Sequence, residues 1–253
     1  MKESSDSQAK NDKKGQTLLK YLTGCGIESR RKLLAAIMEG KVSVNRQIIR
    51  ESGYTVSEKD VIYYKGKRVE KQELLYFAFN KPIRVITTLY DSRRRKTVAD
   101  FFRGLPRVVP VGRLDYMSSG LLIMTNDGAL MHKLMHPKYE IEKEYLVKID
   151  KILPNDIIKY LAAGIELDGD KTAPCKIVVK SRIKDGKYSS MSVFMTLHEG
   201  KNREIRRMME KVGAKVLSLK RIRYKNIFLG NLPEGSYRKL TKHEIYELRN
   251  DLP

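Results

Sequence analysis

The sequence predicts an α+β protein with a small N-terminal part and a larger part built on a mostly antiparallel sheet. Apolar residues first recur at helical spacing between glycine breaks, whereas from residue 75 onward short runs rich in β-branched residues are separated by turn residues. Few helical segments lie between these runs, which favours antiparallel strands over repeated parallel units. The 253 residues, 41% of them hydrophobic, suffice for one large domain or for a small and a medium one.

The N-terminal part is expected to begin after a disordered basic leader at residues 1–16 and to extend over residues 17–75. Ser29 is placed as the N-cap of a helix over 30–38, which ends at Gly40. An earlier helix carries Leu18, Leu19 and Leu22 and is broken by Gly24 and Gly26. The apolar face of the second helix is expected to hold Leu33, Leu34, Ile37 and Met38. Strands are predicted at 42–44 and 60–64.

The second part, residues 76–253, opens on an apolar strand that Pro82 halts. We predict strands at 75–80, 85–88, 108–111, 121–125, 145–149, 176–180, 191–196 and 216–222. We predict helices at 97–103, 128–135, 154–163, 202–211 and 242–249.

The charge of the chain indicates a polyanionic partner. The formal net charge is +21 and the sequence pI is about 9.8. Basic residues cluster at 93–96 and again over 203–225. The two cysteines, Cys25 and Cys175, form neither a disulfide framework nor a zinc motif, which fits a reducing cytosol. We find no apolar run of about 20 residues, the length that a membrane helix needs.

The most informative segment joins Asp115 to a glycine-flanked turn and an apolar strand that stops at Asn126-Asp127-Gly128. A carboxylate held against a buried strand end needs a partner charge or a chemical role. The strings G-R-L-D (112–115), S-S-G-L-L (118–122) and T-N-D-G (125–128) resemble the signature of pseudouridine synthases. The branch they resemble is the RsuA/RluB/RluF type, which modifies bacterial ribosomal RNA.

Two later segments fit the same family in order, K-E-Y at 143–145 and E-G-K-N-R-E-I-R-R-M at 199–208. The resemblance implies a mixed sheet with a central cleft, Asp115 as the catalytic nucleophile and Arg206 as its partner cation. It also implies that Tyr145 packs on the target base and that Arg113, which strand spacing would place on the same face as Asp115, helps to open the RNA. Glu204 departs from the family pattern, in which Gln is usual. Further RNA contacts are expected from Lys201, Arg203 and Arg207.

The N-terminal pattern of helix, G-I-E-S-R-R, helix and G-K-V-S-V-N resembles the αL-type RNA-binding domain of ribosomal small-subunit protein four. That resemblance covers residues 17–75. It implies that Arg30, Arg31, Lys32 and Lys41 contact RNA phosphates.

Other site chemistries have little support. His132 and His136 have the spacing of a metal pair on a helix, but we find no third ligand and expect no metal. Phosphate-binding and dinucleotide-binding glycine motifs are missing from the sequence, so we expect no cofactor. The resemblance implies an enzyme that isomerises one uridine of ribosomal RNA, on free RNA or on a pre-ribosomal particle. The E-G-K-N-R string (199–203) is more typical of enzymes that modify large-subunit RNA. We expect the protein to be monomeric and cytoplasmic. Attack by Asp115 on the sugar or on the base stays open, and the alternative is a non-catalytic ribosome assembly factor on the same fold.

Overall fold

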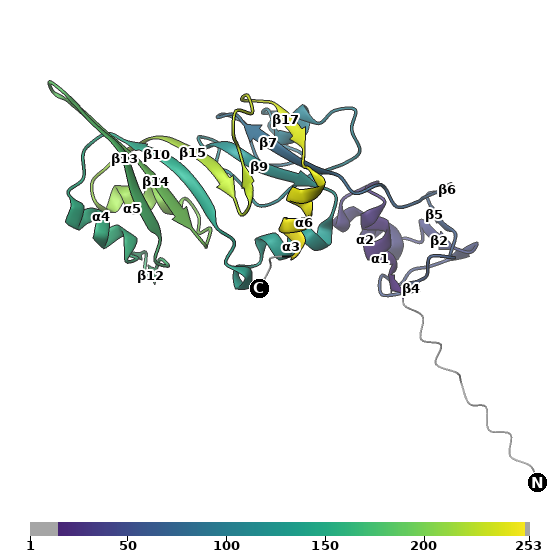
Figure 1. Cartoon of the computed structure of the whole chain (residues 1–253). Coiled ribbons are helices and arrows are strands. Elements are labelled where there is room, and N and C mark those ends of the chain that lie inside the picture. Colours follow the sequence, from purple (N-terminus) through teal and green to yellow (C-terminus); the bar gives the residue numbers. More distant parts are fainter. Residues whose placement is uncertain (1–14, 251–253) are drawn as a thin grey trace, which may run out of the picture. The chain divides into compact units, whose positions relative to one another are not determined.

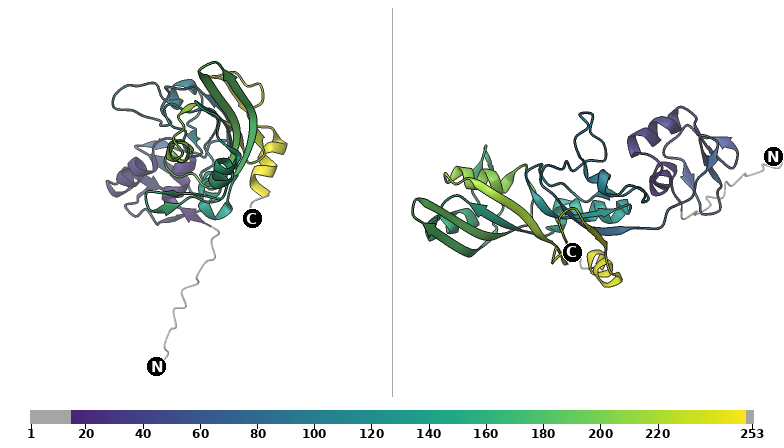
Figure 2. Two further views of the ribbon diagram at one scale, coloured as in Figure 1. Left: turned by 90° about the vertical axis from the view of Figure 1, so that its left-hand side faces the viewer. Right: turned by 90° about the horizontal axis from the view of Figure 1, so that it is seen from above.

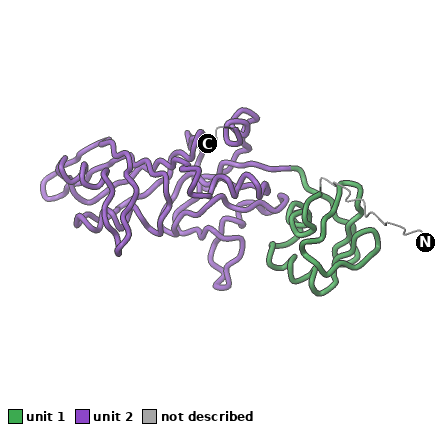
Figure 3. Tube along the Cα trace, turned by 90° about the horizontal axis from the view of Figure 1, so that it is seen from below, with its two compact units in different colours: residues 1–73 green, residues 74–253 purple. Residues whose placement is uncertain are grey.

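The computed structural model describes residues 15–250, which form two compact units that divide between Glu73 and Leu74 (Figure 3). Of the predicted leader, residues 1–14 lie outside the described residues, and Gln16 already pairs in a short strand. No helix within the described range 15–250 is long and apolar enough to cross a membrane.

The first unit packs two helices and several short strands around one apolar core. Its sheet has the strand order β3-β2-β5-β6, and β1 pairs separately with β4. The core is formed by leucines and isoleucines of the helices and by valines of the strands. The elements are β1 (Gln16–Thr17), α1 (Leu18–Gly24), α2 (Arg30–Met38), β2 (Val42–Val44), β3 (Gln47–Ile48), β4 (Thr55–Val56), β5 (Ile62–Tyr64) and β6 (Lys67–Arg68).

Helix α2 forms where its caps predict it. The Ser29 hydroxyl accepts a hydrogen bond from the backbone N–H of Lys32 at 3.3 Å, and Gly40 follows the helix with a φ of +73°. The predicted apolar face was too wide, because Leu34 and Met38 are exposed at 37% and 64%. Both lie one position beyond the buried residues of this face, so the helix turns them about 100° away from the core.

The second unit is built on one nine-stranded sheet, and the predicted α+β class with a mostly antiparallel sheet is confirmed (Figure 1). The main order is β13-β14-β10-β15-β9-β7-β17, with β16 on β15 and β8 on β9. The strands are β7 (Tyr76–Lys81), β8 (Val109–Pro110), β9 (Ser119–Thr125), β10 (Lys143–Ile149), β13 (Lys176–Asp185), β14 (Tyr188–Leu197), β15 (Val216–Tyr224), β16 (Ile227–Phe228) and β17 (Tyr237–Lys239). The strands β11 (Glu166–Leu167) and β12 (Asp170–Lys171) form a separate pair.

The sheet contains one parallel junction, between β9 and β15, and every other pairing between the described strands of this sheet is antiparallel. The junction spans only two pairs, Ser119 with Lys220 and Gly120 with Arg221. Gly120 has a φ of +103°, and a Cβ there would lie 2.2 Å from the carbonyl oxygen of Arg221. Only glycine fits, and the close approach brings the loop before β9 to the middle of the sheet.

Two pairs of helices cover different parts of the sheet. Helices α4 (Asn155–Ala162) and α5 (Glu204–Lys211) share a core with β10 and β14. Helices α3 (Gly128–Met135) and α6 (Lys242–Asn250, yellow in Figures 1 and 2) share a second core with β7 and β9. The third cluster, around Phe77 and Phe79, lies under the loops that precede β9.

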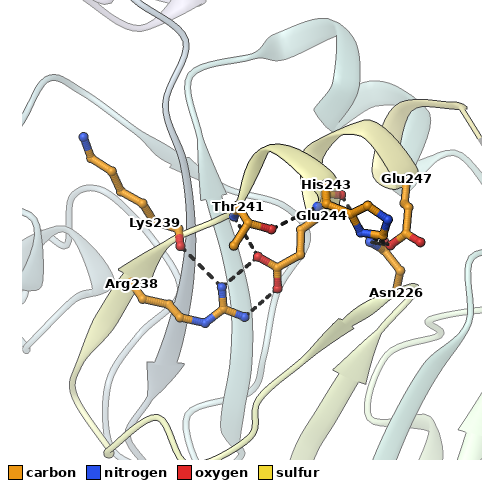
Figure 4. Close-up of polar contacts among 7 residues, drawn as sticks. All are labelled: Asn226, Arg238, Lys239, Thr241, His243, Glu244 and Glu247. Atoms are coloured by element: carbon orange, nitrogen blue, oxygen red, sulfur yellow. Dashed lines mark hydrogen bonds and ion pairs between the residues drawn. The ribbon is translucent and has the colours of Figure 1, made fainter.

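Helix α6 is fixed by polar contacts at its start (Figure 4). Thr241 and Glu244 form a reciprocal capping box, with distances of 2.8 and 3.1 Å. The same carboxylate accepts two hydrogen bonds from Arg238, and Asn226 donates to Glu247 at 2.9 Å. These contacts connect the C-terminal helix to β17 and to the turn after β15.

Three predictions for this unit were wrong in detail. Residues 85–88 form no strand, because their amides bond within a long loop and only Ile86 makes a single bridge, to Thr97. The helix predicted at 97–103 is a short 3₁₀ turn, η1 (Val98–Phe101). Strands β13 and β14 are longer than predicted, because Gly186 and Lys187 form a two-residue hairpin turn between the paired residues Asp185 and Tyr188. A second 3₁₀ turn is η2 (Pro137–Tyr139).

Candidate active site

A pocket in the second unit brings together residues from distant parts of the sequence. Asp115 comes from the loop between β8 and β9, Tyr145 from β10, and Glu204 from the start of α5. Of the residues predicted for the site, five line this pocket, namely Arg113, Asp115, Tyr145, Lys201 and Arg203. The pocket therefore collects members of all three sequence motifs.

Asp115 lies in a loop that is fixed by hydrogen bonds to the backbone groups of its residues. The Thr87 hydroxyl both donates to the carbonyl of Leu114, at 2.7 Å, and accepts from its N–H, at 3.2 Å. The Ser118 N–H donates to the Asp115 carbonyl at 3.0 Å and closes a turn. The prediction that Arg113 and Asp115 share one face of a strand was wrong, because the segment is not a strand, although both residues line the pocket.

Arg206 reaches this loop from α5. Its guanidinium donates to the carbonyl of Met117 at 2.8 Å and to the hydroxyl of Ser118 at 3.4 Å. Burial and neighbouring Arg203 lower the pKa of Arg206, whereas Asp115 raises it. Among residues 15–250 no ion pair joins Arg206 to Asp115 within 4 Å, so the two groups interact through space rather than by direct contact.

Lys81 holds the same loop from the opposite side, and the sequence analysis missed it. Its side chain is fully buried and donates 2.8 Å hydrogen bonds to the carbonyls of Pro82 and Ser118. Burial lowers the pKa of Lys81 to about 8, while Asp115 and Glu234 raise it and Arg221 lowers it. A lysine at the end of a strand of mostly apolar residues was the available signal in the sequence.

Tyr145 lies at an irregularity of the central strand β10. Its neighbours across the sheet are Met195 on β14 and Arg221 on β15, and the register with β15 shifts between Glu144 and Tyr145. Its ring contacts two of the apolar clusters while lining the pocket. Two flanking strands thus fix the ring as one wall, a geometry suited to stacking on a flat ligand.

The opposite wall carries a buried carboxyl group. Glu204 is 5% exposed, and its carboxyl oxygen accepts from the Lys201 N–H at 3.1 Å. Burial first, and then the hydrogen bond and charge of Glu199, raise the pKa of Glu204 to about 8. Burial also lowers the pKa of nearby Lys143 to about 8, with Arg221 lowering it and the two glutamates raising it.

The remaining residues predicted to contact RNA differ in whether their side chains form ion pairs with acidic residues. Arg203 is exposed, Arg207 forms an ion pair with Asp168, and Lys201 forms one with Asp170 at 2.7 Å. In the first unit Arg30, Arg31, Lys32 and Lys41 are all exposed, and the two lysines pair with Glu28 and Glu39.

The rings of His132 and His136 lie near one another at the end of α3, tilted by 52° with centroids 5.4 Å apart. Within the described residues no group of three or more His, Cys, Asp or Glu side chains is placed to hold a metal.

Comparison with known proteins identifies the chain's family. Residues 75–211 match the model of the RNA pseudouridylate synthase family, and residues 18–62 match the S4 domain. The chain belongs to the RNA pseudouridylate synthase family. It is a pseudouridine synthase with an N-terminal S4 RNA-binding domain, and the resemblance inferred from its motifs is confirmed.

Individual relatives support the same family over nearly the whole chain. The chain is 44% identical to the ribosomal large subunit pseudouridine synthase B of Bacillus subtilis, covering 92% of this chain and 96% of the relative. It is 37% identical to the dual-specificity RNA pseudouridine synthase RluF of Escherichia coli, covering 91% of this chain and 77% of the relative. A crystal structure of a pseudouridylate synthase superposes on this chain with a TM-score of 0.64 at 30% sequence identity. The match covers 92% of this chain and 99% of the other.

Proposed function

We propose that this pseudouridine synthase isomerises one specific uridine of ribosomal RNA, in the large subunit, with Asp115 as the nucleophile. The observation that carries the proposal is the pocket in which Asp115 faces residues of the two other family motifs, Tyr145 and the start of α5. The relative from Bacillus subtilis, named for the large ribosomal subunit, supports the choice of subunit.

The proposed chemistry needs little besides a placed carboxylate. The N1–C1′ bond of the uridine breaks, the base turns, a C5–C1′ bond forms, and the C5 proton leaves to solvent while N1 acquires one. The target base must leave its stack to reach Asp115. Tyr145 supplies a wall on which the base can lie, and Arg113, exposed at the mouth of the pocket, is proposed to help open the RNA. Asp115 attacks either the sugar or the base, and both routes use the same pocket.

Arg206 is proposed to support Asp115 by positioning and by charge. It donates to the backbone carbonyl of Met117 and to the side-chain hydroxyl of Ser118, and the charge of Asp115 raises its pKa. A fixed guanidinium suits such a half-buried place better than a flexible ammonium does.

RNA binding is proposed to extend beyond the pocket. Arg203 lies beside it, whereas Lys201 and Arg207 must exchange their acidic partners for phosphates to contribute. In the S4 domain, Arg30, Arg31, Lys32 and Lys41 present cations to solvent and are proposed to contact phosphates. We propose that the protein acts in the cytoplasm as a monomer, on free ribosomal RNA or on an assembling particle.

The decisive experiment compares wild type with Asp115→Asn on ribosomal RNA tritiated at C5 of uridine, without added cofactor. We expect the wild type to release tritium and the variant to fall below about 1% of that rate, because loss of a catalytic group typically costs several powers of ten. Arg103→Gln, at an exposed side chain two residues beyond the end of η1, serves as a charge control. RNA binding by Asp115→Asn should stay near wild type. Turnover by Asp115→Asn near the wild-type rate would refute the nucleophile, and mapping of the product to small-subunit RNA would refute the subunit.

A further inference from the structure

The hairpin of β13 and β14 projects beyond the part of the sheet that forms the pocket. Figure 1 shows this hairpin, in green, extending past helices α4 and α5. Its strands pair as far as Asp185 with Tyr188, next to the turn. The other end of β14 carries Leu197, which lies in the wall of the pocket. At about 3.3 Å per residue, the stretch from Tyr188 to Leu197 spans about 30 Å.

The two faces of this hairpin differ, because successive strand residues point to opposite sides of a sheet. One face belongs to the core that contains α4 and α5, with Met191, Val193 and Met195 of β14 buried there. On the same side Arg182 donates to Asn155 at 2.7 Å and so ties the hairpin to the start of α4. The opposite face, which we call the hairpin face, is formed by Val178, Ser181 and Ile183 of β13 and by Tyr188, Ser190, Ser192 and Phe194 of β14.

Apolar and aromatic groups on the hairpin face are open to solvent. Val178 and Ile183 are 45% and 54% exposed, and Tyr188 is 84% exposed. Phe194 is half-buried, and the Nζ of Lys180 lies 5.5 Å from the centroid of its ring. Serines separate these groups along both strands, so the face offers rings and hydroxyls to a ligand that lies along it.

Positive charge surrounds the hairpin face. The hairpin has one acidic residue, Asp185, against five basic residues, namely Lys176, Lys180, Arg182, Lys184 and Lys187. In residues 15–250 the lysines that form ion pairs all lie outside this hairpin. Its four lysines are therefore available to the charges of a partner.

The base of the hairpin face borders a hollow of about 270 Å³, which Lys176 and Phe194 help to line. Two acidic residues, Glu142 and Glu144, also line it, and both form ion pairs with Arg223, at 2.8 and 2.9 Å. Arg223 and Lys176 together balance these two negative charges, so the hairpin face as a whole keeps its positive charge.

Cations without partners beside exposed rings fit a strand of nucleic acid. Lysines bind phosphates, and an exposed aromatic ring stacks on an unpaired base of any sequence. Serine hydroxyls both donate and accept hydrogen bonds, as contacts to sugar and phosphate oxygens require. An apolar partner would bury the lysines without counter-charges, which is costly. The chemistry of the hairpin face therefore favours a polyanion with flat bases.

We propose that the hairpin face binds a single-stranded segment of ribosomal RNA, with Tyr188 stacked on an unpaired base and the neighbouring lysines bound to phosphates. The inference rests on the proposed function in that it takes ribosomal RNA as the partner. Because Tyr188 lies about 30 Å along β14 from the wall of the pocket, the segment bound here is not the one that carries the target uridine. The hairpin thus adds affinity for RNA beyond the reacting nucleotide.

The test measures affinity for a transcript of large-subunit ribosomal RNA by filter binding, over about 50–300 mM salt. The full-length protein carries Asp115→Asn, so that no modified product forms. The triple variant Lys180→Gln, Lys184→Gln, Lys187→Gln should flatten the log–log salt slope by about two units, because each phosphate contact to a single strand contributes about 0.7. The control triple Lys133→Gln, Lys138→Gln, Lys159→Gln removes the same charge from exposed positions outside the hairpin and should keep the parent slope.

Substitutions of Tyr188 separate stacking from charge. Tyr188→Ala should weaken RNA binding about tenfold, whereas Tyr188→Phe should keep the affinity, because the ring rather than the hydroxyl stacks on the base. With Asp115 restored, Tyr188→Ala should raise KM by the same factor and affect kcat much less. A fall in kcat at constant KM would overturn the proposal, because it would show an effect on the pocket rather than on RNA docking.

The remaining outcomes distinguish this proposal from the proposed function. Equal slopes for the two triple variants, with equal affinities for Tyr188→Ala and Tyr188→Phe, would overturn the hairpin face as an RNA site and favour a protein partner there. Weaker binding by the hairpin variants, in a protein whose Asp115 form releases no tritium from ribosomal RNA, would support the hairpin face and refute the proposed function instead. Tritium release with unchanged affinities would refute the hairpin face alone.

Discussion

Replacement of Lys81 by methionine tests how the loop that carries Asp115, the proposed nucleophile, is held. The wild-type ammonium is fully buried and donates to the carbonyls of Pro82 and Ser118, and burial lowers its pKa from 10.5 to about 8. A shift of that size corresponds to about 3 kcal/mol of unfolding free energy. Between pH 8 and 10.5 the unfolded chain keeps the proton that the folded protein loses, so wild-type stability contributed by this group rises across that window and is lowest below pH 8.

The variant removes the buried charge but leaves two carbonyls without their donor. Each orphaned group costs about 1–3 kcal/mol, which is similar to the cost of burying the charge, so the stability difference at pH 7 alone decides nothing. The pH dependence of this stability difference is decisive, because methionine does not titrate and Lys81 does. We expect the wild type to gain about 3 kcal/mol over Lys81→Met between pH 8 and 10.5, measured by urea unfolding with circular dichroism and with the transition of residues 74–253 fitted separately.

Activity gives the second readout of Lys81→Met. The Ser118 carbonyl belongs to the turn that Asp115 begins, so its release should lower kcat by about tenfold to a hundredfold. Lys148→Met, on an exposed position of β10, should change neither quantity. A stability difference that stays constant above pH 8, together with an unchanged kcat, would refute the conclusion that Lys81 holds this loop.

Two further predictions concern the other cations. Arg206→Ala removes a charged donor to the Met117 carbonyl and should lower the single-turnover rate about tenfold to a hundredfold. Arg206→Lys should have a milder effect. Equal rates for the wild type and Arg206→Ala would place Arg206 outside the reaction. The double variant Arg30→Ala, Arg31→Ala should weaken binding to a ribosomal RNA fragment and reduce the log–log salt slope by about one unit for each lost phosphate contact. Identical slopes would show that this helix does not touch RNA.

The motifs predicted much of the site because each carries its chemistry in a few adjacent residues. G-R-L-D, K-E-Y and the segment from Glu199 lie far apart in the chain, and the sheet brings Asp115, Tyr145 and Glu204 to one pocket. Capping residues likewise fixed α2, since Ser29 and Gly40 act within one turn of the helix ends.

The remainder depends on contacts that local patterns do not encode. A lysine after an apolar strand usually lies at the surface, and Lys81 is buried only because the loop before β9 closes over it. Residues 85–88 have strand propensity, but their amides find partners inside the loop, so tertiary context overrides the pattern. The direct pair expected between Arg206 and Asp115 gives way to bonds with the neighbouring backbone, which no spacing rule reveals.

These contacts indicate how Asp115, the proposed nucleophile, can be positioned without a direct ion pair to its carboxylate. Lys81 and Arg206 bind carbonyl and hydroxyl oxygens of Met117 and Ser118, and within residues 15–250 Asp115 has no ion pair of its own. An arginine bound directly to the carboxylate would occupy the lone pairs that the proposed attack on the uridine requires. Holding the backbone instead fixes the position of Asp115, and both cations still interact with it through space. In the proposed mechanism, Asp115 then lines the pocket with its carboxylate available to the substrate carbon.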